Sequence, residues 1–322
     1  MKPPFKITPA ILARHSEITG WCGKLEGWNL PLPKPEFRRR NQVRSIQGSL
    51  AIEGNSLSIE QVTALLEGKR VLGPSRDILE AQNAMKAYAG LAGYQAYSEK
   101  SFLKAHGILM QGLMDDPGRW RHGSVGIRKG SQIVHVAPPA KMVPRLIKDL
   151  FGYLRSDKET SLLIRSCVFH YETAFIHPFL NGNGRMARLW QTVLLMRHHP
   201  VFAYVPIESV LQAKRKEYYR TIEASNKKGE STPFVEFMLA VIAGALGEYA
   251  REAEVPAQTA QSRLRSARER FRRESFTRKD YLRHCKTIST ATASRDLREG
   301  VVAGMLLKTG DKRKAEYRFR PG

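Results

Sequence analysis

Cysteine is scarce in this 322-residue sequence: Cys22, Cys167 and Cys285 lie too far apart to indicate a disulfide scaffold or a Cys-rich metal site. So few cysteines suit a reducing cytoplasm, where we expect the protein to be. Long hydrophobic runs are also missing, and the richest one, FMLAVIAGAL at 237–246, is too short to span a bilayer. The opening residues MKPPFKITPAIL lack the apolar core of a secretory signal, so we expect no membrane partner.

Acidic side chains are the second shortage, with 30 Asp and Glu against 53 Lys and Arg. The formal net charge of +23 and the pI near 10.2 point to anionic partners. From Arg251 onward there are 19 Lys and Arg and 9 Asp and Glu, a difference of +10, so the tail is especially basic. An apolar content of 42% is ordinary for a globular protein, and the length predicts about two domains.

The segment 177–188, HPFLNGNGRMAR, is the most informative part of the chain. Gly182 and Gly184 have no Cβ, so backbone N–H groups there can approach an anion. A helix that begins near Gly184 points its positive end at the same place. Arg185 and Arg188 are three residues apart, so they lie near one another on that helix and can hold different phosphate oxygens. The pattern therefore favours a ligand that carries phosphate.

Two apolar helices are predicted on either side of this loop. Residues 161–176 have helical spacing of apolar side chains and would deliver His177 at their end, with Cys167 as a small core residue. Residues 186–199 are apolar nearly all round, which is typical of a central buried helix. No acidic or Cys side chain lies at ligand spacing from His170 or His177, so we expect no zinc site.

The segment 177–188 resembles the signature of Fic-domain proteins, His-x-Phe-x-(Asp/Glu)-Gly-Asn-Gly-Arg-x-x-Arg, at every fixed position except Asn181, where the family has an acid. The resemblance implies a mainly α-helical core with a β-hairpin flap, and transfer of AMP from ATP to a Ser, Thr or Tyr hydroxyl of a protein, itself included. His177 would take the hydroxyl proton, and Arg185 and Arg188 would neutralise the triphosphate. Asn183 would either hold an α-phosphate oxygen or lock the loop.

The resemblance also implies a metal cofactor, Mg²⁺ (or Mn²⁺). The family acid holds the metal between phosphates, and Asn181 offers only a neutral carbonyl oxygen, a weaker ligand for a hard cation. We therefore expect Asn181 to be the metal ligand, with most of the coordination coming from phosphate and water.

A second motif, SLAIEGN at 49–55, resembles the inhibitory motif of the same family, (Ser/Thr)-x-x-x-Glu-(Gly/Asn). The inhibitory residues would be Ser49, Glu53 and Gly54. The resemblance implies that Glu53 reaches Arg188 and occupies the arginine that should hold the γ-phosphate, so that the chain inhibits itself. In some family members this Glu supports removal of AMP, which leaves the hydrolytic direction open. Taken alone, the motif indicates only a helix whose end is capped by Gly54.

Residues 123–139 alternate β-branched and polar side chains around Lys129-Gly130-Ser131, which predicts a hairpin. In the family this flap pairs with the backbone of the target and aligns its hydroxyl. Further along, Tyr218 and Tyr219 would flank the adenine and Asn226 would read its edge, although the two tyrosines alone would indicate helix packing. The residues expected to contact ATP are Glu53, Ile133, Val134, Asn181, Gly182, Asn183, Gly184, Arg185, Arg188, Tyr218, Tyr219 and Asn226.

The tail from about Phe271 predicts a small α+β domain. A helix over 276–285, a second helix capped by Ser289 or Thr290 and a Tyr-Arg-Phe strand together resemble a winged helix-turn-helix. The recognition helix would lie near Thr290–Arg298 and a basic wing near Asp311–Lys314, where they could contact DNA or dock on protein. The expected domains are 1–100 (N-terminal arm and helices with the inhibitory motif, the arm at 28–42), 101–250 (Fic catalytic core), 251–270 (basic linker) and 271–322 (winged helix). The basic stretch at 251–270 could also be a helix that leads into the last domain.

Three further readings stay open from the sequence. The chain could be a winged-helix DNA-binding regulator whose Fic core senses nucleotide and transfers little. It could transfer another group, although the intact Gly182-Asn183-Gly184 argues against that. A homodimer is also open, because family members use their oligomeric state to move the inhibitory helix.

Overall fold

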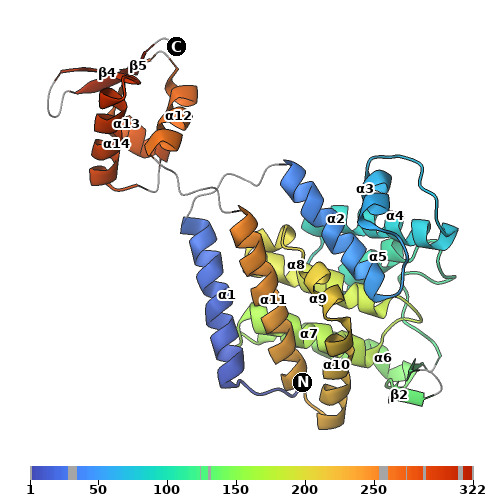
Figure 1. The fold of residues 1–322 in the computed structure, drawn as a ribbon. Helices are drawn as coiled ribbons and strands as arrows, with labels where there is room; N and C mark the ends of the chain where they lie inside the picture. The colour runs from blue at the N-terminus through green and yellow to red at the C-terminus, as the bar shows by residue number, and fades with distance from the viewer. Residues whose placement is uncertain are drawn as a thin grey trace. The chain divides into compact units, whose positions relative to one another are not determined.

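The computed structural model describes residues 2–27, 35–123, 125–129, 132–253, 260–272, 274–285, 288–310 and 315–320, with the backbone alone for 126–129 and 132–136. The chain forms two compact units (Figure 1). One contains residues 1–22 and 33–249, and the other contains 23–32 and 250–322.

The first unit is mainly helical. Its α-helices are α1 (Pro9–Gly27), α2 (Pro35–Ile52), α3 (Ile59–Leu66), α4 (Ser75–Ala89), α5 (Glu99–Leu109), α6 (Val143–Ser156), α7 (Leu162–Ile176), α8 (Asn183–His198), α9 (Ile207–Ala213), α10 (Arg215–Lys228) and α11 (Thr232–Ala253). The last residues of α1, 23–27, and of α11, 250–253, are counted in the second unit. Short 3-10 turns lie at Leu91–Gly93, Ala140–Met142 and Pro200–Ala203, and the strands β1 (Gly126–Lys129) and β2 (Gln132–Val136) form the hairpin.

Helices α7 and α8 pack against each other and form the centre of this unit, which confirms both helices predicted around the loop. Ser161 caps α7 by accepting a hydrogen bond from the backbone of Leu163 at 3.3 Å. Cys167 is fully buried on α7, as expected, and Trp190 is fully buried on α8. Phe102 from α5 meets Trp190 edge to face at 5.0 Å between ring centroids, so α5 closes the core over α8.

Helix α2 approaches α9 closely at Gly48. A Cβ at this position would lie 2.7 Å from the carbonyl carbon and oxygen of Glu208, so glycine is what permits the contact. The extended arm predicted for 28–42 is wrong from Pro35 onward, because α2 begins there. Proline suits the first turn of a helix, where its missing N–H has no intrahelical acceptor to lose. Residues 28–34 lie outside the described part of the chain.

The predicted hairpin is present as an antiparallel pair. Ile127 pairs with His135 and Arg128 with Ile133, and the register shifts between these two pairs. The turn residues Gly130 and Ser131 lie outside the described residues. Helix α11 is long and apolar enough to cross a membrane by length and composition alone, but 67% of that window is buried inside the unit, as in a core helix.

The second unit contains α12 (Ala260–Phe271), β3 (Phe276–Thr277), α13 (Arg278–Cys285), α14 (Thr290–Val302), β4 (Leu306–Thr309) and β5 (Glu316–Phe319). The strands form an antiparallel sheet in the order β3-β5-β4. The predicted helix over 276–285 starts at Arg278 because its first two residues pair with β5. Ser289 caps α14, as predicted, and the strand expected at Tyr-Arg-Phe is β5. The wing predicted at Asp311–Lys314 lies outside the described residues.

Of the two alternatives for 251–270, a linker or a basic helix, the structure has the helix from Ala260 onward, and α12 is part of the core of this unit. Leu264 and Ala267 are buried there. Arg263 holds Asp296 on α14 through two hydrogen bonds of 2.6 and 2.7 Å. Asp296 is fully buried and also accepts a hydrogen bond from Tyr281, so the basic sequence of α12 conceals a structural ion pair.

Candidate active site

His177 lies at the end of α7 in a left-handed backbone conformation, with φ of 51° and ψ of 60°. Its Nδ1 is 3.3 Å from the carbonyl oxygen of Ala174. A carbonyl only accepts, so Nδ1 carries the proton in this bond and Nε2 carries the lone pair of the neutral ring. The local structure therefore leaves Nε2 as the nitrogen that can take a proton.

Asn183 locks the loop that follows. Its Oδ1 accepts a hydrogen bond from the backbone N–H of Phe179 at 2.9 Å, and its Nδ2 donates to the carbonyl of Phe179 at 2.8 Å. Asn183 is buried, so of the two roles expected for it the structure has the second. Gly182 has φ of 80°, and a Cβ there would lie 2.6 Å from Sδ of Met110. Only glycine fits this turn without strain.

His106, which the sequence reasoning missed, holds the same loop from α5. Its Nδ1 accepts a hydrogen bond from Gly118 N–H at 2.8 Å, so its Nε2 donates to the Asn181 carbonyl at 3.0 Å. The ring stacks on Phe179 at 3.6 Å between centroids. Burial lowers the pKa of His106 to about 4, so the ring stays neutral. No local pattern marks His106, because its partners are 12 and 75 residues away.

Arg188 meets the second motif as predicted. Its Nη2 donates to Glu53 Oε1 at 2.7 Å and to the Ser49 carbonyl at 2.9 Å, and its Nε donates to Ser49 Oγ at 3.0 Å. Burial raises the pKa of Glu53, but the charge and hydrogen bond of Arg188 outweigh it, and the pKa is lowered. The carboxylate therefore stays ionised against a guanidinium that is 2% exposed.

Helix α2 ends immediately before Glu53. Gly54 has φ of 95°, and the N–H of Asn55 donates back to the Leu50 carbonyl at 3.2 Å, which closes the helix. The carboxylate of Glu53 lies against Gly184, where any Cβ would collide with it. Glu53 thus occupies the space directly over the first turn of α8.

Arg185 has a carboxylate partner that the sequence reasoning missed. Its Nη1 lies 3.2 Å from Oε1 of Glu80 on α4. The other carboxylate oxygen of Glu80 accepts a hydrogen bond from Asn55 Nδ2 at 3.1 Å. Both signature arginines are therefore paired with acids from the N-terminal helices, although 105 and 135 residues separate the partners.

Both arginines still have buried N–H groups without an acceptor. Nε of Arg185 and Nη1 of Arg188 have no hydrogen-bond partner among the described residues. The first turn of α8 adds backbone N–H groups that have no intrahelical acceptor. Buried donors of this kind are costly unless a ligand supplies acceptor atoms, and a phosphate oxygen suits them best.

Of the residues expected around adenine, Tyr219 is 43% exposed and Tyr218 only 2%. Tyr218 donates a hydrogen bond to His170 Nε2 at 2.9 Å, because His170 Nδ1 is engaged by Gln191 Oε1. Its ring is enclosed, as the helix-packing alternative expects. A place for Tyr218 beside adenine stays a prediction. Asn226 Oδ1 accepts a hydrogen bond from the Tyr171 hydroxyl on α7 at 2.9 Å. The side chains of Ile133 and Val134, in β2, lie outside the described part.

The described residues do not fit the implied metal. Asn181 Oδ1, the expected ligand atom, accepts the Gly182 N–H at 2.7 Å and lies 3.4 Å from Nη2 of Arg185. These donors occupy the lone pairs that a cation would need. Glu53 and Glu80, the nearby carboxylates, are each paired with an arginine. Among the described residues no group of three or more His, Cys, Asp or Glu side chains could hold a metal ion.

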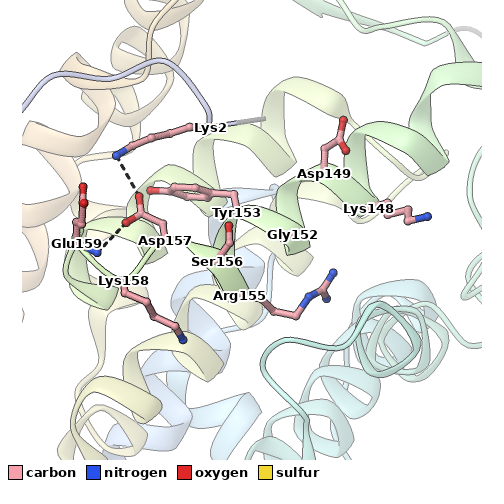
Figure 2. A pocket seen from close by; sticks show the side chains of 10 residues that line it. All are labelled: Lys2, Lys148, Asp149, Gly152, Tyr153, Arg155, Ser156, Asp157, Lys158 and Glu159. Carbon is pink, nitrogen blue, oxygen red and sulfur yellow. Dashed lines mark hydrogen bonds and ion pairs between the residues drawn. The ribbon is translucent and has the colours of Figure 1, made fainter.

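A separate hollow lies on α6, away from these residues in the sequence. Figure 2 shows Lys2 reaching across it to Asp157, at 3.1 Å from Nζ to Oδ2. Its lining consists of Lys2, Lys148, Asp149, Gly152, Tyr153, Arg155, Ser156, Asp157, Lys158 and Glu159. None of the residues predicted to bind ATP belongs to this lining.

The site and the helical core define the class of protein. Residues 96–195 match the model of the Fic/DOC family. A crystal structure of a Fic family protein from Desulfovibrio desulfuricans G20 is 38% identical, with a TM-score of 0.74 over 100% of this chain and 99% of that one. The chain therefore belongs to the Fic family.

Two curated relatives carry the name protein adenylyltransferase. The one from Caenorhabditis elegans, fic-1, is 29% identical over 203 residues, which is 59% of this chain and 37% of that protein. The one from Drosophila grimshawi, Fic, is 30% identical over 211 residues, 62% of this chain and 41% of that protein. The matched region thus spans well under half of the length of these relatives.

Proposed function

We propose that this protein transfers AMP from ATP to Ser, Thr or Tyr hydroxyl groups of proteins, itself included, and restrains that activity through Glu53. The observation that carries the proposal is the set of buried N–H groups on Arg185 and Arg188 that lack acceptors at the start of α8. ATP would bring both the acceptor oxygens and the negative charge. The names of the relatives from C. elegans and D. grimshawi support the same chemistry.

The reaction needs one proton acceptor and a site for the departing charge. The target hydroxyl oxygen attacks the α-phosphorus and forms the new O–P bond, and its proton passes to Nε2 of His177. The bond from the α-phosphorus to the bridging oxygen breaks, and pyrophosphate leaves with the electron pair. Arg185, Arg188 and the N-terminal end of α8 stabilise the charge on the phosphates. Asn183 contributes by holding the loop.

The proposed restraint by Glu53 acts on Arg188. While Glu53 is bound to Arg188, a γ-phosphate meets a carboxylate instead of a guanidinium, so the triphosphate is held in a pose unsuited to transfer. In the reverse direction, water would replace the hydroxyl and AMP would be released from a modified protein. Whichever direction dominates, His177 and Arg188 are the residues used.

The test is labelling with ATP that carries ³²P on the α-phosphate, on the protein alone and in a cell lysate. We expect the Glu53→Gly variant to transfer labelled AMP to protein, and the double variant Glu53→Gly with His177→Ala to transfer none. Glu36→Gly is the matched control, because it removes an exposed carboxylate from the first turn of the same helix. Absence of label in Glu53→Gly, together with absence of AMP release from a pre-labelled lysate, would refute the proposal.

A second candidate function is DNA binding by the C-terminal unit, and the fold of this unit favours it. Three helices packed on a three-stranded antiparallel sheet are consistent with a winged helix, and α14 has Arg295 and Arg298 exposed. We propose DNA as the partner of this unit, with protein docking as the alternative. We also propose that the protein is cytoplasmic and can form a homodimer. Duplex binding should weaken steeply with salt and be lost in R295A/R298A, while R268A on α12 serves as control. Binding that is equal in all three proteins would contradict this role.

A further inference from the structure

Arg121 lies between α5 and the hairpin and is 3% exposed. Its guanidinium donates hydrogen bonds to backbone carbonyls only, among the described residues. Nε donates to His177 O at 2.7 Å, Nη1 to Gly123 O at 2.8 Å, and Nη2 to Pro138 O at 2.5 Å and Ile176 O at 3.3 Å.

These acceptors belong to two functional parts of the molecule. Gly123 leads into the hairpin and Pro138 follows it, so Arg121 joins the two ends of the flap. Ile176 and His177 form the end of α7, where carbonyls have no intrahelical donor and the helix dipole is negative. One buried side chain therefore ties the base of the flap to the backbone of the proposed proton acceptor.

The chemistry of the contact is unusual for a buried arginine. A buried guanidinium normally pairs with a carboxylate, because its desolvation is costly. Arg121 instead uses its rigid fork of donors to hold several carbonyls at fixed directions, which lysine cannot reproduce. His177 needs such support, since a non-glycine residue with φ of 51° is in a strained backbone conformation.

We propose that Arg121 is a positioning residue that fixes the flap relative to the imidazole of His177. A target backbone paired with the flap would then present its hydroxyl at Nε2 of His177. This inference rests on the proposed AMP transfer. It assigns Arg121 no contact with ATP, so its loss should affect alignment of the hydroxyl and leave nucleotide binding in place.

The first test uses Arg121→Lys in the Glu53→Gly background. We expect the transfer rate at saturating ATP to fall about 100-fold, the scale of an alignment error of about 1 Å. The dissociation constant for ATP should stay within about twofold, as for changes outside a binding site. Arg165→Lys is the matched control, because Arg165 is also buried and donates to the Leu154 carbonyl at 2.6 Å, away from flap and loop. Loss of ATP affinity in parallel with transfer would overturn the proposal.

The second test needs no transfer and therefore separates this inference from the proposed function. The N–H of Ala137 donates to Val125 O at 3.3 Å at the base of the flap. In Arg121→Lys its hydrogen exchange should accelerate while amides of α7 stay protected, and Arg165→Lys should leave it unchanged. An unchanged rate at Ala137 in Arg121→Lys would overturn the role of Arg121, whether or not AMP transfer is found.

If Arg121→Lys does not fold, hydrogen exchange in the wild-type protein still tests the role of Arg121. The N–H of Arg121 donates to Pro178 O at 2.9 Å. Its hydrogen exchange therefore reports opening on the loop side of the contacts that Arg121 makes, which we call the clamp. A clamp makes the amides of Arg121 and Ala137 open together and exchange with similar protection. Exchange at Ala137 that is about 100-fold faster than at Arg121 would show independent opening and would refute the coupling.

Discussion

Glu80 pairs with Arg185 at 3.2 Å, just as Glu53 pairs with Arg188 at 2.7 Å. Asn55, two residues after Glu53, donates a hydrogen bond to Glu80 at 3.1 Å and so connects the two acids. The positive N-terminal end of α8 is therefore balanced by two carboxylates, Glu53 and Glu80. Under the proposed function, a triphosphate would compete with both of them.

Glu80→Gln should strengthen ATP binding. Removing this carboxylate frees the charge of Arg185. Because the pair is largely buried, we expect at least the gain of an exposed pair, about 1 kcal/mol or roughly fivefold in the dissociation constant. Calorimetric titration in the Glu53→Gly background measures it. Asp77→Asn is the control, because Asp77 lies one turn earlier on α4 and binds Ser56 instead of an arginine. Weaker ATP binding in Glu80→Gln would contradict the prediction.

Asn181→Asp should create a carboxylate metal ligand at a place where the described residues offer none. A carboxylate is the better ligand for a hard cation, so binding of Mn²⁺ in the presence of ATP should tighten by about tenfold. Electron paramagnetic resonance of free Mn²⁺ measures this without any need for transfer. Asn181→Gln keeps the side chain neutral and should show no gain. Equal Mn²⁺ affinity in Asn181→Asp and wild type would show that another group holds the metal.

Gly48→Ala should release the restraint without touching the site. Its Cβ would meet the Glu208 backbone at 2.7 Å, so α2 must move away from α9, at a cost of about 1–3 kcal/mol in the free energy of unfolding. The shift displaces Ser49 and Glu53 from Arg188, and labelling should rise in otherwise wild-type protein. Gly20→Ala in α1 has nothing within 4 Å and should be neutral or stabilising. If Gly48→Ala is destabilised but its labelling is unchanged, the packing of α2 does not control the restraint.

His106 should make stability depend on pH. The pKa of this buried ring is lowered to about 4 from the ordinary 6.5, so between these values the unfolded chain binds a proton that the folded chain does not. Stability is therefore complete above pH 6.5 and falls as the pH drops toward 4, by up to about 1.4 kcal/mol per pH unit. His106→Gln should flatten this slope in urea unfolding, and the exposed His122→Gln should not. Parallel slopes for His106→Gln and wild type would refute the assignment.

The sequence anticipated the parts of the site that depend on near neighbours. Residues 177–188 are contiguous, so the turn, the start of α8 and the proximity of Arg185 and Arg188 follow from glycine conformation and helical spacing. The cap of α14 at Ser289 and the end of α2 at Gly54 follow from the same local chemistry. The Glu53–Arg188 contact was expected only through the family resemblance, since the motif by itself is common.

Sequence reasoning failed where tertiary packing overrode a local pattern. The proline-rich stretch suggested an extended arm, yet Pro35 starts a helix. The arginine-rich stretch suggested a linker or a basic helix, and the helix is fixed by Arg263, which is held by a buried Asp296. The sequence left Tyr218 open between adenine contact and helix packing, and only the tertiary structure shows that its hydroxyl donates to His170 inside the core. In each case the deciding partner comes from a distant part of the chain.

What the sequence determined by itself is the composition of the site: a histidine, two arginines and a glycine turn that share one stretch of chain. What only the tertiary structure decided is their environment. Glu80 on Arg185, His106 under the loop and Arg121 across the flap all depend on how helices rotate and cross. Helical periodicity fixes which side chains share a face over one or two turns, but it carries no information about which face of another helix they will meet. The balance of charge around Arg185 and Arg188, and with it the proposed restraint, therefore follows from packing.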